Sequence, residues 1–151
     1  MFVVDADLIC FGRALGLLGG DEFQTMGDGA LADVIPQETL DPQWIPTVGD
    51  NQWVVITCDR GIRTGPTEAP LAISHQLKAV HLYNMGHRDP WDQATLLLAK
   101  WPAIEAFVNQ HPIGPWWLSV RKVGPPFEMR YEPGKQEPFM KIRNTSGHPA
   151  G

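Results

Sequence analysis

The chain has few cysteines, no long apolar run and no repeated segment, and each of these shortages excludes a class of protein. Its two cysteines, Cys10 and Cys58, are far apart and neither belongs to a CxxC pair, so neither a disulfide framework nor a zinc ribbon is expected. Gly, Pro or charge interrupts every apolar run before the ~18 residues that a membrane span needs. These features exclude a membrane protein, a coiled coil and a fibre.

Charge is also unevenly distributed. Residues 1–75 contain 11 Asp and Glu against three Lys and Arg, whereas residues 76–151 contain six acids against nine bases. A wholly basic nucleic-acid surface is therefore not expected, and the split favours an acidic pocket in the first half with a milder basic rim from the second. The histidines form no HxH or HExxH pattern, so metal binding through histidine is not predicted.

Size and composition predict a single globular domain. The chain has 151 residues, of which 43% are hydrophobic, enough for one packed core. The first ten residues, MFVVDADLIC, contain acids and no basic leader, from which we expect a cytoplasmic protein.

Apolar patterns alternate between strand and helix along most of the chain. Buried strands are predicted over 2–5, 22–26, 53–57 and 80–83, and helices over 8–18, 36–48, 68–78 and 91–110. This alternation predicts an α/β fold with a small, mostly parallel sheet flanked by helices. Two further strands, 116–120 and 127–131, are expected to form a C-terminal hairpin, and the residues after 131 are interpreted as a flexible tail.

Two of the predicted strands are followed by an acid. FVVD ends in Asp5, and WVVIT is followed by Cys58 and Asp59. If these strands are parallel neighbours, both carboxylates lie at the edge of the sheet where α/β proteins bind ligands. The helix between them supplies a third acid, either Asp41 or Glu38. Asp5 and Asp59 can alternatively be ordinary turn formers or helix caps.

Carboxylates crowded in this way repel one another, by ~4 kcal/mol per pair at 4 Å for an effective dielectric of 20. A hard divalent cation relieves this repulsion, and oxygen ligands are those that Mg²⁺ and Mn²⁺ prefer. Such an ion can activate water for attack on a phosphodiester. The acids therefore indicate a candidate metal-dependent hydrolase.

The blocks FVVDADL and LDPQWIPTVGDNQWVVITCDRGIR resemble the PIN-like nuclease domains, in particular their toxin-like bacterial branch. The resemblance covers residues 2–83, and its most specific part is GDNQWVVITCDRGIR. It implies a three-layer metal-dependent ribonuclease domain over 1–132, with core 2–83 and extension 84–132, followed by the tail 133–151.

The resemblance also implies roles for individual residues and partners. Asp5, Asp41 and Asp59 match the metal ligands, with Glu38 as an alternative to Asp41, and Thr57 matches a loop threonine that positions a water or a carboxylate. The implied cofactor is Mg²⁺ or Mn²⁺. The implied partners are an RNA substrate, an antitoxin protein and a second copy of the chain in a homodimer.

The chain departs from the family pattern at one position. Many PIN domains have a fourth acid two residues after the one that matches Asp59, and this chain has Gly61 there. Asp7 is a candidate to complete the site, or it caps the helix that begins near Leu8. Arg60 and Arg63 are candidate phosphate contacts, with surface arginines or internal ion pairs as the alternative.

Two other functions remain open on the sequence. The missing acid at Gly61 is compatible with a non-catalytic PIN-like binding module. The motif VVDADL also satisfies the strand-end DxD of a haloacid-dehalogenase-type phosphatase that would use Asp5 and Asp7, with Lys78 as the first downstream lysine.

Overall fold

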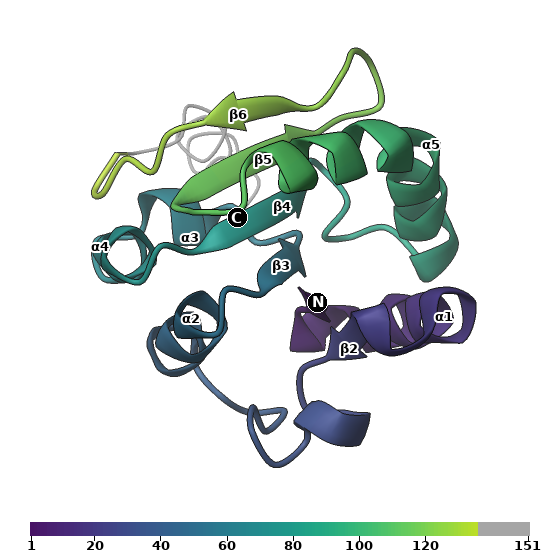
Figure 1. The fold of residues 1–151 in the computed structure, drawn as a ribbon, viewed down its shortest axis with the longest axis horizontal. Helices are drawn as coiled ribbons and strands as arrows, with labels where there is room; N and C mark the ends of the chain where they lie inside the picture. The colour runs from purple at the N-terminus through teal and green to yellow at the C-terminus, as the bar shows by residue number, and fades with distance from the viewer. Residues whose placement is uncertain (136–151) are drawn as a thin grey trace, which may run out of the picture.

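The fold is built on one six-stranded sheet, seen in a computed structural model that describes residues 1–135 (Figure 1). Across the sheet the strands are ordered β2-β1-β3-β4-β5-β6, and all neighbours are parallel except β5 and β6. The strand bounds are β1 Phe2–Val4, β2 Phe23–Thr25, β3 Val54–Thr57, β4 Lys78–Leu82, β5 Trp116–Val120 and β6 Phe127–Met129. The predicted α/β class with a C-terminal hairpin is confirmed.

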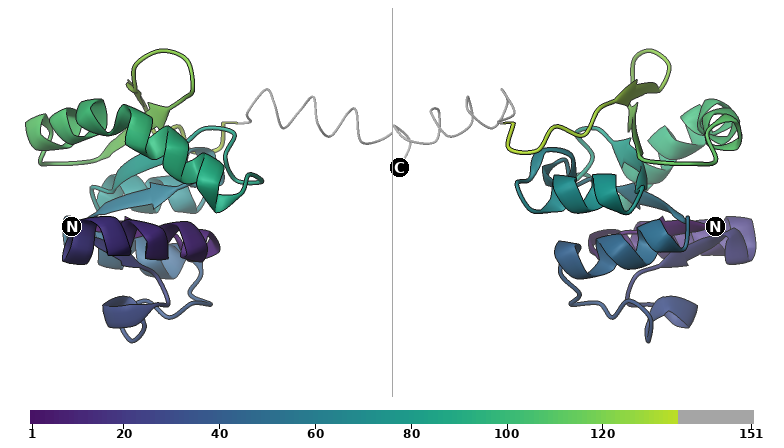
Figure 2. Two further views of the ribbon diagram at one scale, coloured as in Figure 1. Left: turned by 90° about the vertical axis from the view of Figure 1, so that its right-hand side faces the viewer. Right: turned by 60° about the vertical axis from the view of Figure 1, so that its left-hand side comes forward.

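Helices cover both faces of this sheet and give three layers (Figures 1 and 2). Helices α1 and α5 pack on one face, and α2, α3 and α4 on the other. The helix bounds are α1 Ile9–Gly19, α2 Asp41–Asp50, α3 Gly61–Thr64, α4 Glu68–Ser74 and α5 Pro90–Gln110, with 3-10 turns η1 Ala6–Leu8, η2 Gly20–Glu22 and η3 Gly29–Leu31. The ribbon of α5, which contains Pro102, bends along its length as expected for a proline inside a helix (Figure 1).

The central strands are buried on both faces because they lie between the two helical layers. Every residue of β3, β4 and β5 is buried. Their apolar side chains alternate between two cores, one against α1 and α5 and one against α2, α3 and α4. This double burial explains why these strands are continuous apolar runs in the sequence rather than alternating patterns.

The strand order reverses direction beside β1. From β1 the chain passes to β2 on one side of β1 and then crosses to β3 on the other side. Strands β4, β5 and β6 follow in order beyond β3. In open α/β sheets, ligands bind at the carboxyl ends of the strands where this reversal occurs. The residues that follow β1 and β3 are therefore the first to inspect for function.

One predicted helix begins later than expected. The prediction for 36–48 placed Glu38 and Asp41 on the same helix, but α2 runs from Asp41 to Asp50. Leu40 has an extended backbone, and its N–H donates to the side chain of Gln43, which fixes the helix start. Glu38 lies before the helix, in a turn closed by a hydrogen bond from the Thr39 N–H to the Pro36 carbonyl, and therefore not on α2 one helical turn before Asp41.

Residues 132–135 are attached to α3, and the rest of the predicted tail, 136–151, lies outside the described residues. The Glu132 N–H donates to the Arg63 carbonyl, and the Gly134 N–H donates to the Thr64 carbonyl. Among the described helices, none is long and apolar enough to cross a membrane.

Candidate functional site

Asp5 and Asp59 lie at the same edge of the sheet, beside the reversal in strand order. Asp5 follows β1 directly, and Asp59 comes two residues after the end of β3. Strands β1 and β3 are parallel neighbours, with Val4 paired to Ile56, so their carboxyl ends are adjacent. The Asp5 N–H also donates to the Ile56 carbonyl at 3.0 Å, which extends the pairing to the acid itself.

Thr57 links these two acids. Its hydroxyl donates to Oδ2 of Asp5 at 2.9 Å and accepts the backbone N–H of Asp59 at 3.0 Å. Thr57 is fully buried and Asp5 is 8% exposed, so this bridge is shielded from water. The threonine thus fixes the Asp5 carboxylate and the start of the Asp59 loop relative to each other.

The Thr57→Val variant tests this bridge. Valine fits the same space but leaves the Asp59 N–H without its acceptor and Oδ2 of Asp5 without its donor, and each such loss destabilises by ~1–3 kcal/mol. We expect a lower free energy of unfolding in urea for this variant. Thr57→Ser, which keeps the hydroxyl, is the matched control and should retain most of the stability. Equal stability of Thr57→Val and the natural protein would contradict the bridge.

Asp41 approaches the same edge from α2. A cavity of about 390 Å³, the Asp41 cavity, is lined by Asp5, Asp7, Asp41 and Glu68 among others. The Asp41 carboxylate accepts the indole N–H of Trp44 at 2.9 Å. Glu38 is exposed and is not among the lining residues, whereas Glu68, at the start of α4, is. Glu68 is an acid of this edge that the sequence reasoning missed.

Asp59 lines a neighbouring, smaller cavity. This Asp59 cavity has a volume of about 170 Å³ and is lined by Asp5, Asp7, Leu8, Cys58, Asp59 and Gly86. Asp5 and Asp7 therefore line both cavities. Asp7 lies in η1 and is not a helix cap; the cap of that turn is Asp5, whose carboxylate accepts the Asp7 N–H at 3.4 Å.

Burial and mutual repulsion act on the acids of this edge. Burial, with the nearby charges of Asp7 and Asp41, raises the pKa of Asp5 to about 6, although the Thr57 hydrogen bond opposes the shift. Burial likewise raises the pKa of Asp41, helped by the charges of Asp59 and Glu68. The charges of neighbouring acids thus act on both Asp5 and Asp41, which indicates a negative potential at this edge.

The oxygen-only chemistry of this edge suits a hard divalent cation such as Mg²⁺ or Mn²⁺. Within residues 1–135, however, no three His, Cys, Asp or Glu side chains are grouped as a ready ligand set. Asp41 and Asp59 line different cavities, and Asp5 is the predicted ligand common to both. The structure brings the three predicted ligands to one edge in two adjoining cavities, rather than into the single hollow that the sequence suggested.

Gly61, which replaces the usual fourth acid, supports the Asp59 loop. Its backbone N–H donates to Oδ1 of Asp59 at 2.8 Å, in a turn that leads directly into α3. A Cβ atom at position 61 would lie 3.0 Å from that same oxygen, so a side chain would crowd the carboxylate.

The two candidate phosphate-binding arginines lie in different environments. Arg60 lines a third cavity of about 510 Å³ beside Asp59. Arg63 is 4% exposed, donates to the Arg130 carbonyl at 2.8 Å and pairs with Glu132 at 3.8 Å. Arg63 is therefore buried against the C-terminal segment, and its geometry corresponds to internal pairing rather than to the phosphate contact that the sequence suggested.

The third cavity contains residues that the sequence reasoning did not select. His81 lies near the end of β4, where it pairs with Thr57 across the sheet, and Tyr83, Asn84 and His87 follow it. The strand-end argument that selected Asp5 and Asp59 could have found His81, since it lies within the strand predicted over 80–83. Histidine spacing alone gives no such signal, because the histidines form no HxH or HExxH pattern.

Comparison with protein families supports the PIN-like relationship over part of the chain. Residues 20–84 match a family model described as "PIN like domain". The matched segment contains Asp41, Thr57 and Asp59 but begins after Asp5 and Asp7. Searches of curated proteins and of solved structures gave no match.

Proposed function

We propose that this protein is a divalent-ion-dependent ribonuclease that hydrolyses phosphodiester bonds with water. The observation that carries the proposal is the Thr57 bridge between Asp5 and the Asp59 loop, beside Asp41, at the point where the strand order reverses. The match of residues 20–84 to a PIN-like model supports nuclease-type chemistry at the level of the family.

Asp5, Asp41 and Asp59 are the residues that would hold Mg²⁺ or Mn²⁺. When bound, such an ion supplies Lewis-acid activation of water and positive charge beside the phosphodiester. Asp7 and Glu68 add negative charge to the Asp41 cavity and so increase its attraction for a cation.

The protein's own groups supply positioning. Thr57 holds the Asp5 carboxylate, and the Gly61 N–H holds that of Asp59. In this proposal Arg60, next to Asp59, faces the phosphate, to which a guanidinium can donate two parallel hydrogen bonds.

RNA cleavage by single-site variants tests this proposal. We expect cleavage by the natural protein with Mg²⁺ or Mn²⁺, loss of cleavage with EDTA, and a loss of at least ~100-fold in Asp5→Asn and Asp59→Asn. Asp21→Asn removes a carboxylate from η2, before β2 and therefore at the other edge of the sheet, and should cleave normally. Full cleavage by purified, folded Asp59→Asn would overturn the mechanism.

For the biological setting, we propose the toxin of a bacterial toxin–antitoxin pair that acts on cytoplasmic RNA. The support is the resemblance of GDNQWVVITCDRGIR to that branch of PIN-like domains. The same variants test it, because expression of the natural protein in a bacterial host should arrest growth and expression of Asp59→Asn should not.

A non-catalytic binding module is the second candidate, favoured by the glycine at position 61. Absence of Mn²⁺ or Mg²⁺ binding at millimolar concentration would support it. The phosphatase alternative is weaker, because Lys78 begins β4 at the edge opposite Asp5 and donates to the Pro112 carbonyl at 3.1 Å.

A further inference from the structure

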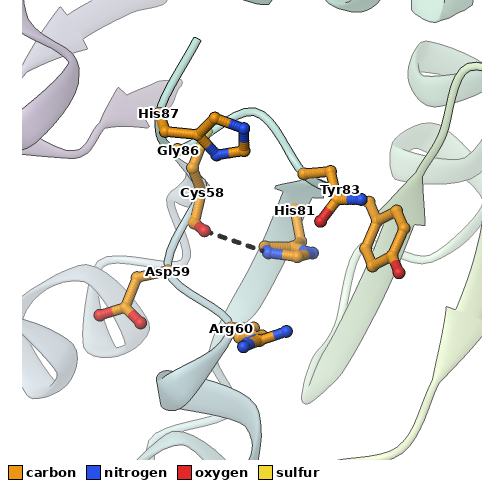
Figure 3. Close-up of a pocket in the computed structure, with 8 residues that line it drawn as sticks. Cys58, Asp59, Arg60, His81, Tyr83, Gly86 and His87 are labelled. Carbon is orange, nitrogen blue, oxygen red and sulfur yellow. Dashed lines mark hydrogen bonds between the residues drawn. The ribbon is translucent and has the colours of Figure 1, made fainter. Parts of the chain in front are cut away.

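A pocket lies beside the acidic edge, and the hydrolysis proposed above uses only Asp59 and Arg60 of its lining residues. This His81 pocket has a volume of about 510 Å³, within the range of ~300–1,000 Å³ usual for small-ligand sites. Cys58, Asp59 and Arg60 line one side, and His81 and Tyr83 line the other (Figure 3). Asn84 also lines the pocket.

The His81 pocket adjoins the acidic edge. Cys58, Asp59 and Gly86 line both this pocket and the Asp59 cavity. A molecule that occupies the pocket therefore lies beside Asp59, and the adjoining smaller cavity is also lined by Asp5. A nucleotide chain could place one unit in the pocket and its phosphate at the acids.

The back of the pocket presents a fixed imidazole. His81 is 5% exposed, and its ring lies against that of Trp117 with centroids 4.8 Å apart. Its Nε2 lies 3.3 Å from the Cys58 carbonyl, which requires the proton on Nε2 (Figure 3). In the neutral ring, Nδ1 is then a hydrogen-bond acceptor, and no contact to it is found among the described residues.

The outer wall adds an aromatic face and an amide. The Tyr83 ring stacks on the guanidinium of Arg121, whose central carbon is 3.9 Å from the ring centroid. Asn84, exposed at the rim, can both donate and accept hydrogen bonds. An acceptor nitrogen, an amide and an aromatic side chain around one cavity suit a planar heterocycle that carries donors and acceptors, as a nucleobase does.

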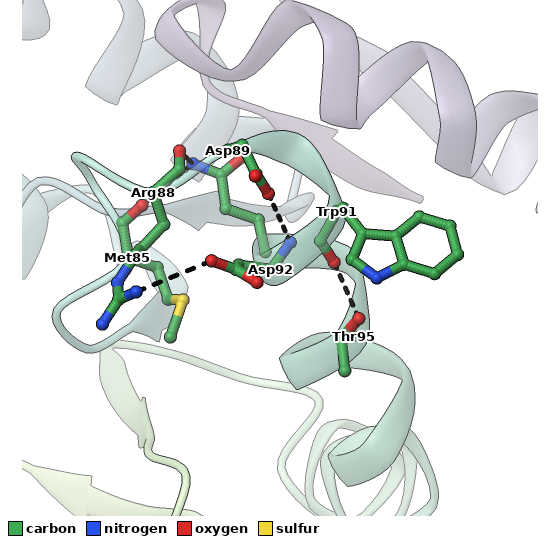
Figure 4. A network of polar contacts seen from close by, with 7 residues as sticks. Met85, Arg88, Asp89, Trp91, Asp92 and Thr95 are labelled. Atoms are coloured by element: carbon green, nitrogen blue, oxygen red, sulfur yellow. Dashed lines mark hydrogen bonds and ion pairs between the residues drawn. The ribbon is translucent and has the colours of Figure 1, made fainter.

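The loop that forms this wall is held in place by α5. The buried amide of Gln93 donates to the carbonyls of Met85 and Arg88 at 2.9 and 3.2 Å. Asp89 caps the helix by accepting the Asp92 N–H at 2.9 Å, and Arg88 pairs with Asp92 (Figure 4). The pocket is therefore formed before any ligand binds, which lowers the entropic cost of binding.

We propose that the His81 pocket binds the base of the RNA nucleotide next to the scissile phosphate. That the ligand is part of an RNA rests on the proposed ribonuclease function. Binding of a base to the pocket can nevertheless be measured without cleavage. The pocket would thus set which nucleotide is preferred beside the cut, while the acidic edge performs hydrolysis.

Binding of the four ribonucleosides, followed by NMR, tests the pocket directly, with ribose as the control that lacks a base. We expect one or more nucleosides to shift the signals of His81, Tyr83 and Asn84, and ribose to leave them unchanged. Asn84→Gly, which removes the amide and tolerates the positive φ of 57° at this position, should weaken binding about tenfold. Tyr83→Ala should weaken it similarly.

Asn51→Ala is the matched control, because Asn51 ends α2 at the opposite edge of the sheet; this variant should bind nucleosides normally.

A random RNA pool gives a second readout: Asn84→Gly and Tyr83→Ala should alter the nucleotide preferred at the cut. If RNA is cleaved but no nucleoside shifts the pocket signals, the pocket assignment is overturned and the ribonuclease stands. If nucleosides bind but RNA is never cleaved, the placement beside a scissile phosphate is overturned together with the proposed function.

Discussion

The Asp5→Asn variant is expected to be more stable than the natural protein at pH 7 in EDTA, by ~2 kcal/mol. Asp5 is 8% exposed and lies near the charges of Asp7 and Asp41, and its pKa is raised from 3.8 to about 6. A folded-state pKa above the unfolded one means that ionisation at pH 7 favours unfolding. Raising the pKa from 3.8 to about 6 corresponds to ~3 kcal/mol, part of which is lost because asparagine replaces one acceptor oxygen with an N–H donor.

Urea unfolding of both proteins in EDTA measures this difference. Asp59→Asn is the matched control, since Asp59 is exposed and its neutralisation should change the free energy of unfolding by no more than ~0.5 kcal/mol. A gain in stability with a loss of RNA cleavage would identify Asp5 as a residue whose charge is kept for function at the expense of the fold. A less stable Asp5→Asn protein would contradict this account.

The strand ends could be predicted from the sequence because simple physical rules determine them. FVV and WVVIT are continuous apolar runs, which are typical of strands buried on both faces, and an acid after such a run must lie at the carboxyl edge. Parallel pairing of β1 with β3 then places Asp5 near Asp59. The strand pattern and the α/β class are therefore sufficient to predict that Asp5 and Asp59 lie close together.

The positions of other site residues depend on where a helix begins and on the direction in which a side chain points. Glu38 and Asp41 share an apparently helical stretch, and the side chain of Gln43 decides that the helix starts at Asp41. Arg63 follows Asp59 closely in sequence, yet its guanidinium contacts the Arg130 carbonyl 67 positions away. A long-range contact of this kind has no periodic signature, so the sequence could not decide between phosphate contact and internal pairing for Arg63.

The second large expected effect is on the pH dependence of the free energy of unfolding. Asp5 and His81 contribute to this dependence with opposite signs. Burial lowers the pKa of His81 from 6.5 to about 4, so between these values the unfolded chain binds the additional proton and stability falls as the pH falls. For Asp5, whose pKa is raised from 3.8 to about 6, the folded protein binds the additional proton and stability rises as the pH falls. In the natural protein the two contributions largely cancel between pH 6 and 4.

Asp5→Asn removes the contribution of Asp5 to the pH dependence of stability and leaves that of His81. We expect its free energy of unfolding to decrease from pH 6.5 toward pH 4 with a slope approaching ~1.4 kcal/mol per pH unit, steeper than in the natural protein. Asp5→Asn and the natural protein, measured by urea unfolding in EDTA at each pH, differ only in Asp5, so other titrating groups cancel in the difference. His81→Asn should give the opposite dependence, with stability rising as the pH falls below 6. If the difference in stability between His81→Asn and the natural protein does not change between pH 6.5 and 4.5, His81 does not remain neutral in the folded protein, and the hydrogen-bond acceptor assigned to its Nδ1 is lost with it.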